Sequence, residues 1–556
     1  MANIRTPHAA VVIWNYDERF GSSPATDPNE VDRVVVSTIS LTSIKTTKAK
    51  NNPQGSFEFS LAPTKNWVSL LTPGSWCTIL MSNHALTKAD FTKADPKKVK
   101  MVGKIESVRV DVSVDGDGTR KTNYVVTGTD WGYIFNNIIY IDNNIAGENE
   151  PLTQGNGVAI AIRRILFGER GTPNSYSVKD NLLSLIKLFG NGLRGLSEQG
   201  DEINRLANAV YDFAMPKDMV NFFQFVNPNG IGTSDKINES MTLYTGRLTG
   251  YDSYSNDDVA EGFLDPFSLQ GQHTFWQILI ENSNPALNEM FCELKWDTAG
   301  PRLALYNRMK PFSVNKNAGL SSDDFKSYFN DIKCNVIEKE DILGVNAGTN
   351  WRDKFNFVEI KPTFQAFDTF APWYKRESQQ FDKEAFQREG FRPLILPTKQ
   401  FPKGTINAAK VDWKQMANWS NAVKDWYFDT HKMLNGTINI IGQSNYIGVG
   451  ENIMFSSEVI AATPNINKAQ MDLKKSVNIL AHVESVSHSF SVNGDGSRQY
   501  LTTIQFVRGI LVNESRAVVG NGMLDAKASV FNSGEPANSK NIVATSTKQD
   551  PNLGAE

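Results

Sequence analysis

KIESVRVDVSVDGDGTR, at residues 104–120, and HVESVSHSFSVNGDGSR, at residues 482–498, are two copies of one pattern. With a shift of 378 residues, nine of the seventeen positions are identical without a gap. In each copy apolar residues alternate along a stretch that runs into a Gly-Asp-Gly turn, and a second apolar stretch follows. Alternation with a period of two indicates a strand, and the turn glycines permit the positive φ of a tight hairpin. Both copies are therefore predicted to be β-hairpins.

The match extends upstream of each hairpin. Pro73-Gly74 and residues 76–80 have a counterpart in Val449-Gly450 and residues 452–455. The chain is therefore predicted to carry two related β-barrels, one near each end, with the remaining residues inserted between them. A duplicated barrel lets one chain present the same interface twice around a symmetry axis. The alternative interpretation is an old duplication that is retained only for folding.

Composition and periodicity divide the chain into five predicted parts. These are a first tube-type β-barrel (1–145), a mostly helical insertion domain (146–320), a mixed α/β connecting domain (321–430), a second tube-type β-barrel (431–515) and a flexible C-terminal tail (516–556). Helical spacing is seen in Val158–Phe167, Asn181–Phe189, Asp201–Met215, Thr274–Leu294 and Asp412–Leu434, and a long loop or an irregular subdomain is expected over Asn227–Gly262. The predicted fold class is α+β and multi-domain, with two homologous small antiparallel β-barrels that flank a largely helical, mixed insertion.

Charge and composition exclude several classes of protein. Lys and Arg number 57 and Asp and Glu 60, so the formal charge is −3, which argues against a general nucleic-acid binder. The three widely spaced cysteines predict neither a disulfide framework nor a cysteine zinc site. The sequence offers no apolar run of the roughly 18–20 residues that a membrane helix needs, and the stretch Ala9–Trp14 is too short for a signal peptide. We therefore expect a soluble protein, made in a cytoplasm and without stable membrane anchoring.

Motifs for cofactors are weak. Gly190–Gly195 matches GxGxxG, but a helical stretch precedes it where a dinucleotide site needs a strand, so a turn is expected. An EF-hand that starts at Asp115 would place Val126 where the bidentate Glu belongs, so this segment is also read as a turn. His482 and His488 have an even separation in one predicted strand and should share a face, as a metal pair or as packing. We expect no cofactor, no metal and no catalytic residue.

Four stretches carry a resemblance to a known family. They are Phe57-x-Phe59-x-Leu61 with Trp67 and residues 71–79, then Gly103–Val108 with its hairpin up to Trp131, then Asn284–Phe312, and finally Phe386–Arg392 with Trp426-Tyr427 and Gly436–Ile440. In this order, together with the repeat, they resemble the baseplate central hub protein of tailed bacteriophages. They are also similar to the hub part of the spike in type VI secretion systems.

The resemblance implies a structural virion protein of the tail baseplate, made in the bacterial host cytoplasm, and not an enzyme. It implies a homotrimer whose six barrels form a pseudo-hexameric ring between the hexameric tail tube and the trimeric central spike. The implied partners are the tail tube protein, the central spike protein and baseplate wedge proteins. DNA would pass through the lumen without sequence-specific binding. The long insertion and the tail depart from a compact hub and leave their own partners open.

Two alternatives and one interface expectation complete the interpretation. The chain could be the hub of a genome-less contractile injection particle, or a tail-associated peptidoglycan hydrolase. Paired carboxylates for glycan hydrolysis have no positional signal among 60 acidic residues. Contacts between subunits or with the tube are expected at the two Gly-Asp-Gly turns, at Asp115, Gly116, Asp117, Asn493, Gly494 and Asp495.

Overall fold

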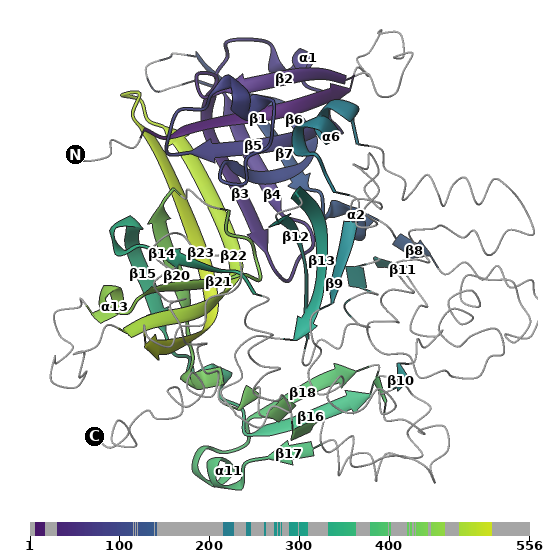
Figure 1. Cartoon of the computed structure of the whole chain (residues 1–556), viewed down its shortest axis with the longest axis vertical. Coiled ribbons are helices and arrows are strands. Elements are labelled where there is room, and N and C mark those ends of the chain that lie inside the picture. Colours follow the sequence, from purple (N-terminus) through teal and green to yellow (C-terminus); the bar gives the residue numbers. More distant parts are fainter. Residues whose placement is uncertain are drawn as a thin grey trace, which may run out of the picture.

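The computed structural model describes eleven stretches of the chain. These are residues 6–16, 31–141 (apart from 115, 117, 119 and 138), 215–226, 241–245, 261–262, parts of 272–309, 332–362, 379–401 (apart from 399), parts of 420–442, 446–461 and 477–513. They are mostly strand, and thirteen strands join into one large sheet (Figure 1). The fold is thus β-rich, and the described residues do not show the α+β class with a helical insertion that the sequence predicted.

The large sheet contains the same five-stranded arrangement twice. The first unit has the order β3 (Leu41–Ala49), β4 (Ser56–Leu61), β7 (Arg120–Asp130), β6 (Val99–Val114) and β5 (Trp76–Ser82). The second unit has the order β15 (Ile342–Gly348), β20 (Leu434–Ile441), β23 (Arg498–Asn513), β22 (Val477–Val492) and β21 (Asn452–Ser456). All these neighbours are antiparallel. Two strands, β1 (His8–Tyr16) and β2 (Val31–Ser37), extend the first unit beyond β5, and β14 (Cys334–Ile337) pairs in parallel with β21.

The two predicted hairpins are confirmed and pair in one register. Matched pairs include Val114–Arg120 with Val492–Arg498, and Val108–Val126 with Val486–Ile504. In both hairpins the register shifts by one residue at the Glu-Ser-Val motif, where Glu106 and Glu484 are the extra residues. An extra residue bends the strand locally and reverses the alternation of side chains beyond it.

The edge strands of the two units also match. β3 and β15 each pair with the next strand through one register shift, at which Thr42 and Leu343 are the extra residues. Upstream of each hairpin, Gly74 and Gly450 have φ of +89° and +76°. Their N–H groups donate to the carbonyl oxygens of Ile105 (2.7 Å) and Val483 (2.9 Å), which are equivalent residues of the repeat. The duplication therefore includes strand order, bulges and turn geometry.

Two hydrophobic cores follow from this arrangement. The first lies within strands β1–β7 and includes Phe57, Phe59 and Ile79, together with Phe490 and Tyr500 from the second hairpin. The second packs β15 and β20–β23 around residues such as Ile438 and Phe506. Because Phe490 and Tyr500, on the strands next to the tip of the second hairpin, lie in the first core, the two units are packed as one body.

The described helices are short, and the strands outside the large sheet form small sheets. The helices are α1 (Trp67–Leu70), α2 (Tyr133–Asn137), α6 (Lys217–Phe223), α11 (Lys383–Glu389) and α13 (Glu458–Ala461), with 3-10 turns at Lys88–Phe91, Lys339–Asp341, Trp351–Asp353 and Thr430–Lys432. Two small sheets have two strands each: β8 (Ile139–Ile141) pairs with β11 (Gln272–Thr274), and β10 (Glu261–Gly262) pairs with β19 (Gln400–Phe401). In a third sheet, β13 (Gly300–Met309) lies between β12 (Asn288–Asp297) and β9 (Met241–Thr245). In a fourth, β16 (Phe357–Pro362) lies between β17 (Gln379–Phe381) and β18 (Pro393–Thr398).

Several predictions for the middle of the chain need correction. Thr274–Leu294 was expected to be a helix; residues 276, 277 and 280 are helical, but Thr274 ends β11 and Asn288 begins β12. The range Asn227–Gly262, expected to be a long loop or an irregular subdomain, contains β9 and β10. Of the expected helix Asp412–Leu434 only part is described; residues 420, 421, 423, 424 and 427 are helical, and Leu434 begins β20. The strand β12 forms because its side chains pack against both units, a tertiary contact that local periodicity does not report.

Other predictions for the middle and the end of the chain lie outside the described residues. These are the expected helices Val158–Phe167 and Asn181–Phe189, nearly all of Asp201–Met215, and the tail 516–556. The second unit takes β15 from the part assigned to the connecting domain, so its strands begin well before residue 431. The five-part division otherwise stays a prediction. Among the described helices, none is long and apolar enough to cross a membrane.

Candidate functional site: the joint between the two units

The predicted contact residues lie at the tips of the hairpins. Gly116 is exposed in the first turn, whereas Asp115 and Asp117 lie outside the described residues. Asn493, Gly494 and Asp495 form an exposed second turn. This turn is closed by its own hydrogen bonds, since the Ser497 N–H donates to the Asp495 carboxylate (2.9 Å) and the Asn493 N–H to the Ser497 carbonyl (2.8 Å). The contact role of these turns stays a prediction.

The joint between the units is a strand pair that the sequence did not predict. β22 pairs on one side with β23, and on the other side first with β21 and then with β3 of the first unit. The pairing with β3 runs from Ser485 opposite Ala49 to Ser491 opposite Ser43. Along this pair, Phe490 lies opposite Ile44, and each side chain is only 1% exposed. Two segments about 440 residues apart thus form one continuous sheet.

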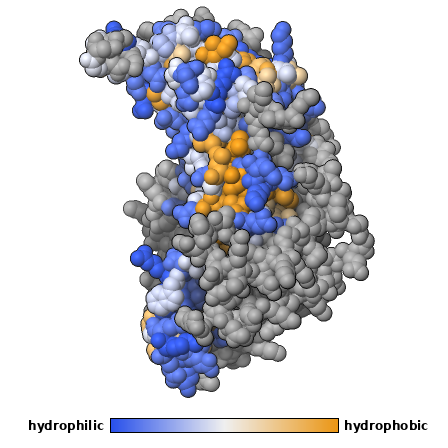
Figure 2. Space-filling model, turned by 90° about the vertical axis from the view of Figure 1, so that its left-hand side faces the viewer, coloured by the Kyte–Doolittle hydropathy of each residue, from blue (hydrophilic) through white to orange (hydrophobic). Residues whose placement is uncertain are grey.

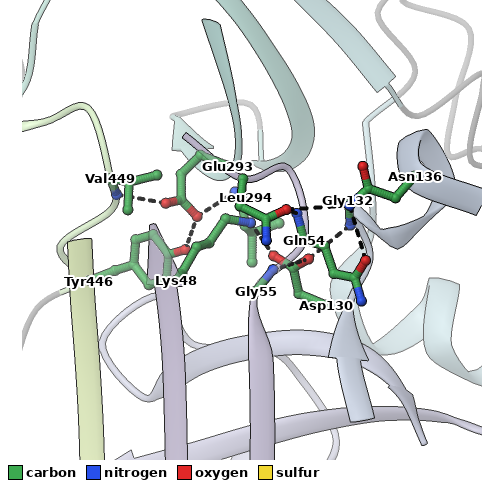
Figure 3. Close-up of polar contacts among 11 residues, drawn as sticks. Lys48, Gln54, Gly55, Asp130, Gly132, Asn136, Glu293, Leu294, Tyr446 and Val449 are labelled. Atoms are coloured by element: carbon green, nitrogen blue, oxygen red, sulfur yellow. Dashed lines mark hydrogen bonds and ion pairs between the residues drawn. The ribbon is translucent and has the colours of Figure 1, made fainter. Parts of the chain in front are cut away.

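A buried ion pair lies beside this joint (Figure 3). Lys48, on β3, pairs with Asp130 at the end of β7, and both side chains are buried. Burial alone would lower the pKa of Lys48, but the carboxylates of Asp130 and Glu293 reverse this effect and raise it. The second oxygen of Asp130 accepts from the Gly55 N–H (2.9 Å) and the Gly132 N–H (3.1 Å). Such pairing and hydrogen bonding is what a buried charge needs.

The carboxylate of Glu293 reaches the joint from β12. It accepts hydrogen bonds from the Tyr446 hydroxyl, from the Val449 N–H (2.7 Å) and from the Leu294 N–H (2.9 Å). Burial raises the pKa of Glu293, although Lys48 and these donors act in the opposite direction. Burial and the nearby Glu293 likewise raise the pKa of Tyr446 well above its ordinary value. A raised-pKa acid is thus present, but both of its oxygens are committed to internal donors.

A second carboxylate of β12 contacts both units. Glu289 lies 2.9 Å from the Lys50 ammonium at the end of the first-unit segment β3, and 3.0 Å from the imidazole Nε2 of His482 in the second unit. The other ring nitrogen of His482 bonds to Asn452 (2.9 Å). Lys50 also pairs with Glu484, the extra residue of the second hairpin. Glu289 and Glu293 therefore fasten β12 across the joint, four residues apart.

The two histidines of β22 do not share a face, contrary to the expectation. The register shift at Glu484 lies between them and reverses the alternation, so His482 meets β12 while His488 lies on the side of Val486 and Phe490. His488 is hydrogen-bonded to Thr502 (2.9 Å). Burial, reinforced by the charge of Lys100, holds the pKa of His488 well below its ordinary value. In the described part of the chain no group of three or more His, Cys, Asp or Glu could hold a metal ion.

The joint is thus a place of attachment within the chain. Its charged groups are buried, paired and surrounded by donors, which fixes the two units and β12 relative to one another. Of these residues, the sequence analysis named His482, and the stretches of the resemblance contain Asp130, Glu289 and Glu293 without giving them a role. Lys48 was missed, and the burial of the two glutamates was not predicted, although glutamates beside apolar residues in the stretch Asn288–Leu294 are a signal for buried carboxylates.

Comparisons with known proteins find similarity only in structure. Neither a protein-family model nor a curated protein sequence matches the chain. The chain is similar to a tail protein from Neisseria meningitidis, at 9% identity and a TM-score of 0.40 over 90% of this chain and 96% of that one. It is also similar to the 43 kDa tail protein of prophage MuSo2 from Shewanella oneidensis, at 11% identity and a TM-score of 0.38 over 90% and 98%.

A third similar structure belongs to a secretion machine. It is an Escherichia coli component of the type VI secretion system that is described as similar in structure to two tail proteins of bacteriophage T4. The identity is 8% and the TM-score 0.32, over 86% of this chain and 75% of that one. The matched structures are thus named as tail proteins and as a type VI secretion component, the kinds of protein that the sequence motifs resemble. Likenesses this distant do not carry a function to this chain.

Proposed function

We propose that the chain is a structural protein of a phage-type tail baseplate. Three copies would form a hub that joins the tail tube to the central spike, with baseplate wedge proteins as further neighbours. The observation that carries the proposal is the duplication. One chain contains two five-stranded units with the same strand order, the same bulges and the same turn geometry.

The duplication supports this role through symmetry. Three chains with two equivalent units each would present six similar sheets around a three-fold axis. Such a ring can face a six-fold tube on one side and a three-fold spike on the other. A single-unit protein could match only one of the two symmetries with equivalent contacts. The paired, buried charges of the joint suit a mechanical part, because they hold the units in one fixed arrangement.

The test is the oligomeric state and symmetry of the full chain. Sedimentation velocity at high protein concentration should give a trimer mass. Single-particle imaging without imposed symmetry should give rings with three-fold symmetry and six inner lobes around a hole. A closed ring with another number of chains, or a particle whose two units lie at different radii, would overturn the hub proposal.

Passage of DNA through such a ring calls for weak contacts. With a formal charge of −3, the chain has no excess of Lys and Arg with which to replace phosphate counterions. We expect the ring to show no retention of double-stranded DNA in a filter-binding assay at 0.15 M salt. Tight binding that falls steeply as the salt concentration rises would contradict a lumen that lets DNA slide.

A further inference from the structure

The two hairpins differ in one respect, which is the neighbour on their outer edge. β22 pairs along Ser485–Ser491 with β3. The equivalent segment of β6, Ser107–Ser113, pairs with β7 on its inner edge, and on its outer edge it has no strand among the described residues, because β5 ends opposite Val99–Lys104. One hairpin is thus in the middle of the sheet and the other has an open edge.

The exposure of the side chains differs between the two hairpins in the same way as their neighbours. Val110 and Val112 of the first hairpin are 47% and 48% exposed, whereas His488 and Phe490, at the same positions of the second hairpin, are 4% and 1% exposed. Val114 is 69% exposed, while its equivalent Val492 packs against the first core. Exposed valines that alternate along an open edge strand favour pairing with another strand.

The matching open edge is β15. It is the equivalent of β3, it lies at the end of the strand path, and among the described strands it pairs only with β20. On β3, Leu41 and Ile44 are 2% and 1% exposed and belong to the first core. Their equivalents Ile342 and Val345 are only partly buried against the second core. Among the described elements, the four-residue helix α13 also contacts β15, but no strand gives β15 the cover that the second hairpin gives to β3.

The surface near β15 carries exposed apolar side chains beside charged ones such as Lys339 and Glu458. Figure 1 shows β14, β15 and α13 on one side of the molecule, and Figure 2, which views that side, shows apolar surface gathered at mid-height. Leu343, the extra residue of β15, is 55% exposed, and Val336 of β14 is 45% exposed. An edge strand of seven residues beside apolar surface fits the addition of a strand from another chain.

We infer that β15 of one chain pairs antiparallel with β6 of a second copy, in the register that β3 and β22 use within the chain. Shifting the β3–β22 pairs by 301 and 378 residues places Val112 opposite Val345, Val110 opposite Ala347 and Asp111 opposite Asn346. The first hairpin would then complete the second core of the neighbour, as the second hairpin completes the first core within one chain. This inference rests on the hub proposal for its closure into a ring, since the contact joins two different edges and is head-to-tail.

Cysteine pairs test the contact and its register. Facing residues of antiparallel strands lie about 4.5–5.5 Å apart at Cα, which a disulfide can span. Hydrogen-bonded and non-hydrogen-bonded pairs alternate along antiparallel strands. V112C/V345C and D111C/N346C are consecutive pairs, so one of them is a pair without backbone hydrogen bonds. After mild oxidation, at least one should run as a covalent trimer on a non-reducing gel. The three native cysteines are buried and should give little background.

Two controls calibrate the result. K45C/S489C is the pair within the chain that is equivalent to D111C/N346C, and it should form an internal disulfide that leaves the mass unchanged. V112C/A347C is out of register by two residues and should give at least tenfold less covalent trimer.

The outcomes separate this inference from the hub proposal. A trimer by sedimentation with no covalent product in either variant, while K45C/S489C oxidises, overturns the contact and leaves the hub. Covalent products that grow into long polymers support the contact and overturn the closed ring. A chain that stays monomeric, with no covalent product, overturns both.

Discussion

The two hairpins of this protein have nearly the same local structure but lie in different surroundings. The registers of their strands and their bulges agree, because the repeat carries the turn glycines and the Glu-Ser-Val motif in both copies. Their exposure does not agree, since one hairpin lies against β3 and the other has an open edge. Local sequence thus sets the hairpin, and the neighbouring strand decides whether its outer residues form a core.

The largest expected difference is between truncations at equivalent positions of the two hairpins. F490A removes a ring that is 1% exposed in the first core and should lower the free energy of unfolding by about 3–5 kcal/mol. V112A, at the equivalent but exposed position, should change it by less than about 0.5 kcal/mol when the chain is monomeric. Denaturant unfolding at low protein concentration measures both. Equal losses would mean that the first hairpin is already covered within one chain.

The next difference concerns Gly74 and Gly450. Both have positive φ, so an alanine at either position costs about 1–2 kcal/mol. A Cβ on Gly74 would meet nothing within 4 Å, whereas one on Gly450 would lie 2.1 Å from the ring of Phe291. G450A should therefore destabilise the protein more than G74A in thermal unfolding. The opposite order would show that β12 does not pack on the second unit as described.

The third prediction uses His488, whose equivalent in the first hairpin is Val110. Because burial, together with the charge of Lys100, keeps the pKa of His488 well below its ordinary value, the folded state leaves this residue neutral while the unfolded chain binds a proton below about pH 6.5. Stability is therefore present above that pH and is lost as the pH falls, by about 1.4 kcal/mol per pH unit. H488V should have a shallower loss than wild type between pH 6.5 and 5 in urea unfolding. Parallel curves for the two proteins would show that His488 does not titrate in this way.

The smallest difference is expected where the two hairpins are equivalent. Gly118 and Gly496 have φ of +81° and +80°, and a Cβ on either would meet nothing within 4 Å. G118A and G496A should each cost about 1–2 kcal/mol, through backbone strain alone. Thermal unfolding should therefore give the same shift for both variants. A clear difference would mean that one turn already contacts another surface.

Sequence reasoning succeeded where the structure is local. Alternation around Val108 and Val486, together with the Gly-Asp-Gly turns, was enough to predict both hairpins, and the repeat predicted their equivalence. The shared face of His482 and His488 failed because the one-residue shift at Glu484 leaves no mark in the alternation that was read.

The joint could not be predicted, because its partners have no local signal. Ile44 and Phe490 pair although they lie far apart in the sequence, and the residues near either one do not identify the other as its partner. The residues of β12 were predicted to be helical because the spacing of Phe291 and Leu294 fits one face of a helix. Their packing on the two units instead stabilises a strand. Buried partners far apart in sequence were thus the main source of error.

The pairing of β3 with β22 also has a consequence for synthesis. Thr47 and Ser487 are 440 residues apart, so at about 5–20 residues per second a ribosome needs roughly 20–90 s between them. Throughout that interval the edge of β3 and the core that receives Phe490 are open. The nascent chain therefore carries an unfinished sheet while the residues between β3 and β22 are made, and the first unit closes only once the second hairpin has been synthesised.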